Sequence, residues 1–263
     1  MRNIKLTIEY DGSNYQGWQR QKNTNQTLQE IIERALRKIL QKRVRLIASG
    51  RTDAGVHALG QVANFKTNAK IPIRNLKQAL NSLLPDDIVI TGACEVDLKF
   101  HSCFDAKSKI YRYTILNQAH PSAHWRNLSY FVTYKLDFKK MKRAAKILIG
   151  RHDFRSFQAA DKKPRDSIRT IKRINVYKVK NFTPPFLHSS VGLRQERAGF
   201  IFIDIEADGF LYKMARNIVG TLIEIGRGKR LPTSIHEILA SRNRQFAGST
   251  VPGHGLCLLQ VKY

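Results

Sequence analysis

Two hydrophobic patterns that follow one another along the chain constrain its fold more than any other feature. Near the N-terminus, apolar residues occupy every second position (Ile4, Leu6, Ile8 and Tyr10), which is typical of a half-buried strand. Residues 28–40 then carry apolar side chains at helical spacing, and Thr27 with Glu30 predicts a capping box at the start of that helix. The chain therefore begins as a strand followed by an amphipathic helix.

The same alternation continues to the C-terminus. We expect further strands over 44–48, 61–67, 88–90, 110–116, 171–179, 200–206 and 257–263, and further helices over 76–84, 137–148, 210–225 and from 234 onward. Asp137 is the expected cap of the second of these helices, and Ser234 with Glu237 of the last. Residues 182–198, with two prolines, predict a long loop. The pattern predicts an α+β fold, with helices on a largely antiparallel sheet and two similar halves, 1–105 and 106–263.

The net charge points to a polyanionic partner. The 263 residues include 46 Lys+Arg against 20 Asp+Glu, a formal charge of +26. Nucleic acid is the commonest partner of so basic a surface, although a generally basic proteome or attraction to an anionic membrane would also produce it. Between Lys135 and Arg173 there are 14 Lys/Arg and four Asp/Glu, beside Phe154 and Phe157. We expect this segment to contact RNA phosphates, the alternative being a solvated charged face.

Several classes of protein are disfavoured. Three separated cysteines form no zinc spacing and no disulfide framework, which fits a reducing cytosol. No signal-peptide core precedes the first strand, and no run of about 18 apolar residues predicts a membrane helix. His120 and His124 are spaced like metal ligands but have no acidic partner nearby. Residues 220–229 lack the spacing of a nucleotide-binding loop.

The stretch GRTDAGVHALG, residues 50–60, is the strongest candidate for a site. It places a carboxylate, Asp53, between Arg51 and Gly55 in a loop expected between two strands. Such loops on a rigid sheet commonly present catalytic groups. The alternative is that Asp53 only caps backbone amides in a turn. His57 could contact RNA or satisfy the loop, and we favour the structural role.

This stretch resembles the signature of the tRNA pseudouridine synthase A family. Further motifs of that family occur in order along nearly the whole chain: YDGSNYQGWQRQ, LNSLLPDDI, FDAKSKIYRYTILN, GRHDFRSF, ADGFLYKMARNIVG and AGSTVPGHGLCLLQVKY. The resemblance implies two similar α/β halves that form one continuous, mainly antiparallel sheet flanked by helices, with a central basic cleft.

The resemblance also implies an activity. Asp53 would be the nucleophile that attacks the target uridine at ribose C1′ or uracil C6. The N1–C1′ bond breaks, the uracil turns within the pocket, and C5 bonds to C1′. No cofactor is needed, because nothing is oxidised or transferred from outside. The targets implied are uridines 38, 39 and 40 of the tRNA anticodon arm.

Three more residues match family positions. Arg216 matches the arginine that pairs with the catalytic aspartate, since a carboxylate stripped of water needs a cation. Tyr111 matches the tyrosine that stacks on the uracil, although it could pack in the core as Tyr113 does. Arg51 matches an arginine thought to help flip the base, which takes a few kcal/mol. The alternative for Arg216 is a solvated helix charge.

The chain departs from the family pattern at residues 102 and 103. Ser102 and Cys103 stand where the family usually has Ala-Arg, so one RNA or structural contact is expected to be lost.

The resemblance implies a cytoplasmic homodimer that binds tRNA and does not bind a membrane. A non-catalytic RNA-binding protein of the same fold would share the charge but would not need Asp53, Tyr111 and Arg216 together. A nuclease would need a second acid or base beside Asp53, where the loop offers only His57.

Overall fold

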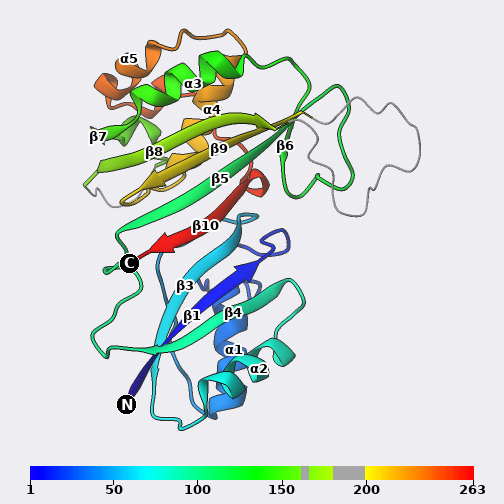
Figure 1. Ribbon diagram of the computed structural model, residues 1–263, viewed down its shortest axis with the longest axis vertical. Coiled ribbons are helices and arrows are strands. Elements are labelled where there is room, and N and C mark those ends of the chain that lie inside the picture. The colour runs from blue at the N-terminus through cyan, green and yellow to red at the C-terminus, as the bar shows by residue number, and fades with distance from the viewer. Residues whose placement is uncertain (161–165, 180–198) are drawn as a thin grey trace. The chain divides into compact units, whose positions relative to one another are not determined.

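The chain divides into two compact units in the computed structural model, which describes residues 1–160, 166–179 and 199–263 (Figure 1). The first unit comprises Met1–Ile110 together with Cys257–Tyr263, and the second comprises Tyr111–Leu256. The C-terminal strand therefore belongs with the N-terminal residues. Each unit is described by itself. The loop predicted over 182–198 lies outside the described residues.

The sheet of the first unit has the strand order β4-β1-β3-β10. Its members are β1 (Arg2–Tyr10), β3 (His57–Thr67), β4 (Ile88–Val96) and β10 (Leu256–Lys262), and the short β2 (Ile47–Ala48) also pairs with β3. Strand β1 is antiparallel to both β3 and β4, whereas β10 is parallel to β3. The predicted alternation in β1 is confirmed, because Ile4, Leu6 and Ile8 have no exposed surface.

Two helices belong to this unit, α1 (Leu28–Leu40) and α2 (Ile73–Leu83). Helix α2 packs against β4, and α1 packs against α2. The predicted capping box is wrong: the Thr27 hydroxyl forms no capping bond, and the Glu30 carboxylate lies 2.6 Å from the Arg20 guanidinium. The first N–H groups of the helix instead donate to the carbonyls of Gly17 and Trp18. Backbone carbonyls of the preceding loop therefore satisfy the N–H groups that a capping side chain would otherwise bind.

The sheet of the second unit has the strand order β5-β9-β8-β7. Its members are β5 (Ser108–Asn117), β7 (Gly150–Asp153), β8 (Ile168–Val179) and β9 (Phe200–Ala207), with β6 (Tyr130–Val132) parallel to β5. Strand β8 is antiparallel to both β7 and β9. Strands β6 and β7 were not predicted, because each is too short to display a period.

Helices α3 (Phe138–Ile147), α4 (Met214–Gly226) and α5 (Ser234–Ser241) complete the second unit, with short 3₁₀ turns at Arg155–Phe157, Arg244–Phe246 and Gly253–Gly255. The Asp137 cap is confirmed, since its carboxylate accepts the Lys140 N–H at 3.0 Å. Helix α4 begins at Met214 and not at Phe210, because Lys213 adopts a left-handed conformation with φ of 58°. The Ser234 capping box is wrong, because that hydroxyl donates to the Leu231 carbonyl.

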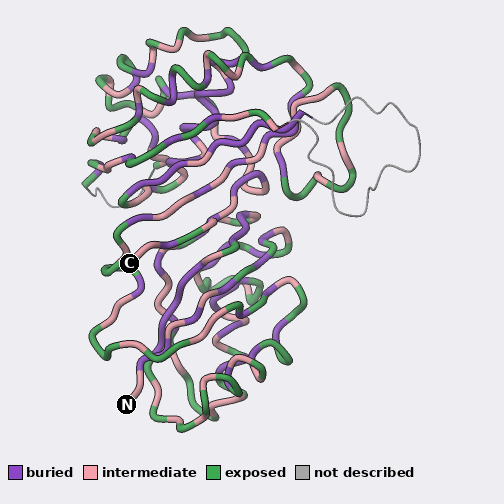
Figure 2. Tube along the Cα trace, viewed as in Figure 1, coloured by how far each residue is buried: buried purple, intermediate pink, exposed green. Residues whose placement is uncertain are grey.

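Buried residues line the strands and the inner faces of the helices in each unit (Figure 2). Helix α3 packs on α4 and β8, and α4 is buried along most of its length. Helices and mainly antiparallel strands within each unit confirm the predicted α+β class. None of the helices in the described ranges is long and apolar enough to cross a membrane.

Candidate functional site

The segment that carries Asp53, residues 49–56, connects β2 to β3 and is called the Asp53 loop below. Strand β3 begins at His57, four residues earlier than predicted, so the loop is shorter than the sequence suggested. Its first residues are fixed by the Gln61 side chain, which bonds the Ser49 hydroxyl at 2.7 Å and donates to the Gly50 carbonyl at 2.9 Å. At the other end, Val56 N–H donates to the Asp53 carbonyl at 3.2 Å. Asp53 is half-buried.

A second loop, residues 11–18, packs directly against the Asp53 loop. Trp18 N–H donates to the Thr52 carbonyl at 3.0 Å, and Gly55 N–H to the Tyr15 carbonyl at 3.4 Å. The Tyr10 hydroxyl, at the end of β1, bonds the Thr52 hydroxyl at 2.8 Å. Burial raises the pKa of Tyr10 above its ordinary range, against the opposing effect of that hydrogen bond. Thr52, the neighbour of Asp53, is thereby held from two directions.

Glycines permit this close packing. A Cβ atom on Gly12 would lie 2.0 Å from the Val56 carbonyl oxygen, and one on Gly17 would lie 2.8 Å from the Thr52 carbonyl oxygen. Gly55 and Gly17 also have φ of 74° and 87°, which side chains rarely adopt. No period in the sequence indicates that residues 11–18 pack against the Asp53 loop. The glycines in YDGSNYQGW were the available signal that its backbone meets another chain segment closely.

His57 joins the same two loops. Its Nδ1 lies 3.0 Å from a carboxylate oxygen of Asp11 and 3.1 Å from the backbone nitrogen of Gly12. The Gly12 N–H donates to this nitrogen, so Nδ1 links the loop of residues 11–18 to the start of β3. Burial raises the pKa of Asp11, but the hydrogen bonds from Ser13 and the charge and hydrogen bond of His57 outweigh it, so the pKa is lowered. His57 itself is 6% exposed, which supports its structural role.

Tyr111 lies on β5 in the second unit and is 7% exposed. Its ring meets Phe210 edge to face, with centroids 4.9 Å apart and planes at 80°. Tyr113 and Ile115, two and four residues along the strand, are fully buried, as expected of core residues. Burial raises the pKa of Tyr113 far above its ordinary range, with the charge of Arg216 opposing the shift. Tyr111 therefore keeps a small accessible surface that Tyr113 lacks.

Arg216 is the third residue of α4 and is half-buried. Its Nε donates to the Val251 carbonyl at 2.7 Å, which anchors the guanidinium to the segment before β10. Arg51 is exposed, in the Asp53 loop. Asp53 and Arg51 thus belong to the first unit and Arg216 to the second, and the ion pair between Asp53 and Arg216 stays a prediction.

The basic segment from Lys135 to Arg173 includes one clear cationic surface, on α3. The inner face of the helix buries Met141, Ala144 and Ala145. Its outer face exposes four cations at successive helical turns, and none has a side-chain partner among the described residues: Lys139, Lys142, Arg143 and Lys146. Phe154 and Phe157, which stand beside this charge in the sequence, have no exposed surface and so do not contribute to the cationic surface.

Ser102 is hydrogen-bonded through its hydroxyl, its N–H and its carbonyl. The buried hydroxyl donates to the Ile47 carbonyl in β2, and the Ser102 N–H donates to Asn64 at 3.0 Å. Tyr263 bonds the Ser102 carbonyl at 2.8 Å. Cys103 is exposed. The turn is therefore fixed to the strand that leads into the Asp53 loop.

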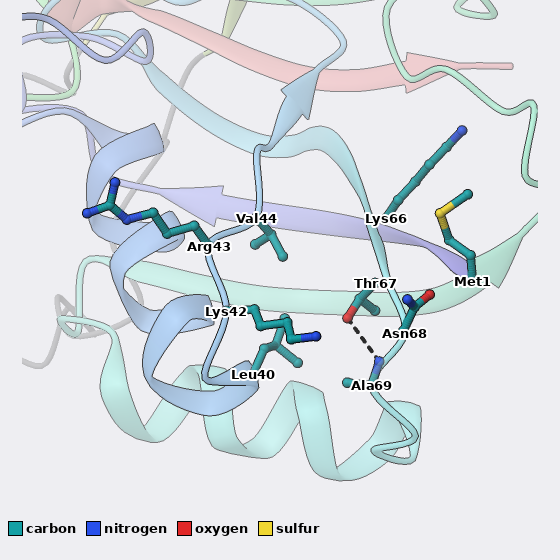
Figure 3. A pocket seen from close by; sticks show the side chains of 9 residues that line it. All are labelled: Met1, Leu40, Lys42, Arg43, Val44, Lys66, Thr67, Asn68 and Ala69. Carbon is teal, nitrogen blue, oxygen red and sulfur yellow. Dashed lines mark hydrogen bonds between the residues drawn. The ribbon is translucent and has the colours of Figure 1, made fainter.

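One cavity in the first unit, of about 320 Å³, lies at the opposite end of β3 from Asp53 (Figure 3). It is lined by Met1, Leu40, Lys42, Arg43, Val44, Lys66, Thr67, Asn68 and Ala69. Its cations do not converge, because Arg43 and Lys66 point away from one another. In the part of the chain that the structure covers, no group of three His, Cys, Asp or Glu side chains is placed to hold a metal ion.

These features are those of an α+β enzyme for a polyanionic substrate, with a carboxylate on a rigid loop. Comparison with known proteins gives the family. The family model for tRNA pseudouridine synthase matches residues 6–105 and 144–263, which include Asp53 and Arg216 but not Tyr111. The chain belongs to the tRNA pseudouridine synthase family.

Similar curated proteins agree over the full length. The chain is 48% identical to tRNA pseudouridine synthase A of Acetivibrio thermocellus, 44% identical to that of Thermoanaerobacter pseudethanolicus, and 46% identical to tRNA pseudouridine synthase A 2 of Clostridium perfringens. Each alignment spans 263 residues and all of both chains.

Proposed function

We propose that the chain converts uridines 38, 39 and 40 of the tRNA anticodon arm into pseudouridine, without a cofactor. The observation that carries the proposal is Asp53, presented by a loop that two neighbouring segments fix, in a chain of this family. Preorganisation of this kind is what a reaction needs when its nucleophile must meet one flipped nucleotide.

Asp53 is the nucleophile in this proposal. Its carboxylate attacks ribose C1′ or uracil C6, the N1–C1′ bond breaks, and the released uracil rotates in the pocket. A bond forms between C5 and C1′, the bond to Asp53 breaks, C5 loses its proton and N1 gains one. The isomerisation balances without an oxidant, a metal or a second substrate.

Three residues assist it. Arg216 pairs with Asp53 and places a positive charge beside the carboxylate, and its hydrogen bond to Val251 fixes the guanidinium direction. Tyr111 stacks on the uracil and helps to remove the C5 proton, with Phe210 holding its ring. Arg51, exposed on the Asp53 loop, helps to extrude the base.

The partner is tRNA, bound by a surface that includes the outer face of α3. Neutralising phosphates on these cations releases counterions, so affinity should fall with salt. We further propose that the protein acts in the cytoplasm as a homodimer, because the resemblance to the tRNA pseudouridine synthase A family implies both properties.

A non-catalytic RNA-binding protein remains the second candidate, because a charge of +26 suits it equally. The packing of the Asp53 loop distinguishes the catalytic function from the non-catalytic one. Binding phosphates does not require the glycine contacts and the buried Tyr10–Thr52 hydrogen bond that hold the neighbour of Asp53 in place. The catalytic function is favoured for this reason.

The test is tritium release from tRNA labelled at uracil C5, followed by mapping of the modified positions. The wild-type protein should release tritium, and replacing uridines 38, 39 and 40 by cytidine should remove the release. Release that persists from the substituted tRNA would place the target elsewhere. No release from any tRNA, with tight binding retained, would favour the binding protein.

A further inference from the structure

The side chain of Lys109, on β5, lies across the start of the Asp53 loop. A Cβ atom built on Gly50 would lie 3.1 Å from Nζ of Lys109, 3.5 Å from Cε and 3.9 Å from Cδ. The end of the lysine therefore fills the space that a side chain at position 50 would use. Glycine at this position leaves room for the ammonium group directly beside the backbone that leads to Asp53.

Both partners in this contact have fixed backbones. At the start of β5, Lys107 N–H donates to the Lys262 carbonyl at 2.8 Å, and Ser108 is 1% exposed. On the other side, the Gly50 carbonyl accepts from Gln61 at 2.9 Å. The Lys109 ammonium therefore lies beside an anchored stretch of backbone, three residues before Asp53.

The charges around this contact favour an anionic ligand. Lys109 and Arg51 bring two positive charges to a stretch, residues 50–55, whose one carboxylate is Asp53. Lys109 is half-buried, so part of its surface remains accessible. A uridine within an RNA chain carries a phosphate on each side of its ribose, and a lysine binds phosphate as a point charge.

We propose that Lys109 binds an RNA backbone phosphate next to the target uridine and so positions that nucleotide at the Asp53 loop. This inference rests on the proposed function. Because the phosphate does not change charge during the isomerisation, the contact stabilises the bound substrate and the transition state equally. Its loss therefore raises KM and leaves kcat nearly unchanged.

The test compares Lys109→Met with Lys109→Arg. Lys109→Met should weaken tRNA binding about tenfold, the usual effect of losing one charge-assisted hydrogen bond. The slope of log affinity against log salt should become shallower by about 0.7, the value for one phosphate of a single strand. Lys109→Arg keeps the charge and should restore both. Lys66→Met is the matched control, because Lys66 is exposed and lies nine residues along β3 from His57, about 30 Å away.

Gly50→Ala adds an independent arm. The added methyl group would lie 3.1 Å from the Lys109 Nζ and push it aside by a few tenths of an ångström. Any rise in KM should therefore be smaller than the rise caused by Lys109→Met, and Gly50→Ala should have no further effect in Lys109→Met. A fall in kcat at unchanged KM, or a salt slope equal to that of the wild type, would overturn the proposal. Salt slopes are measured by binding alone, so a protein that never released tritium would refute the proposed function and still test the Lys109 contact.

Discussion

Gly12→Ala tests whether the loop of residues 11–18 sets the position of Asp53. The new Cβ atom would lie 2.0 Å from the Val56 carbonyl oxygen, whereas ordinary contacts begin near 3.4 Å. The two segments must therefore separate by about 1.4 Å, and Val56 is three residues from Asp53. Misplacing a catalytic group by about 1 Å lowers rates about 100-fold. We expect a fall in kcat of at least that size, with overpacking that destabilises the fold by about 1–3 kcal/mol.

The assay is single-turnover tritium release, together with tRNA binding and thermal unfolding. Binding should stay within severalfold of wild type, because the proposed phosphate contacts, at Lys109 and on α3, do not involve Gly12 or Val56. Gly92→Ala is the control: its Cβ would lie 3.2 Å from the Thr7 hydroxyl, so a shift of a few tenths of an ångström relieves it. A folded Gly12→Ala protein that reacts at the wild-type rate would refute the reasoning.

Three further predictions concern the supports of the site. Tyr10→Phe removes the buried bond to Thr52 and should lower the unfolding free energy by about 1 kcal/mol and kcat severalfold, measured by urea unfolding and tritium release; unchanged values for both would contradict the contact. Asn217→Ala removes a fully buried amide that donates to the Phe157 carbonyl at 2.7 Å, and calorimetry should record a loss of about 3 kcal/mol; a loss below about 1 kcal/mol would count against it. Asp11 has a folded-state pKa below the ordinary 3.8, so its stabilisation is complete above that pH and disappears as the pH falls through the folded-state pKa. Asp11→Asn should therefore be less stable than wild type near neutral pH, with the gap closing in acid unfolding; a gap independent of pH would refute this.

The accuracy of the predicted fold depended on the length of each strand or helix, because a hydrophobic period is visible only over several residues. The nine residues of β1 and the thirteen of α1 display their periods fully, and both were predicted within two residues. Strand β7 has four residues and gave no signal. The start of α4 was misplaced because the apolar pattern of residues 210–225 does not reveal the left-handed backbone of Lys213.

Residues of the site were predicted unevenly for a related reason. Asp53 stands out because a motif of fixed spacing surrounds it in the chain. Supporting contacts join residues far apart in the sequence: Tyr10 with Thr52, Gly12 with Val56, and Lys109 with Gly50. No local period encodes such contacts, so only the folded chain reveals them. Glycine at positions 12 and 50 was the one local hint.

Tritium release by Asp53→Asn under single-turnover conditions tests the central claim most directly. Asparagine keeps the size of the side chain, so the fold and the tRNA affinity should be retained. It lacks the carboxylate, so it cannot act as the nucleophile. With enzyme in excess over bound tRNA, we predict no release above background, while the wild type releases tritium from its target uridines. Release by Asp53→Asn at the wild-type rate would show that another group attacks the uridine.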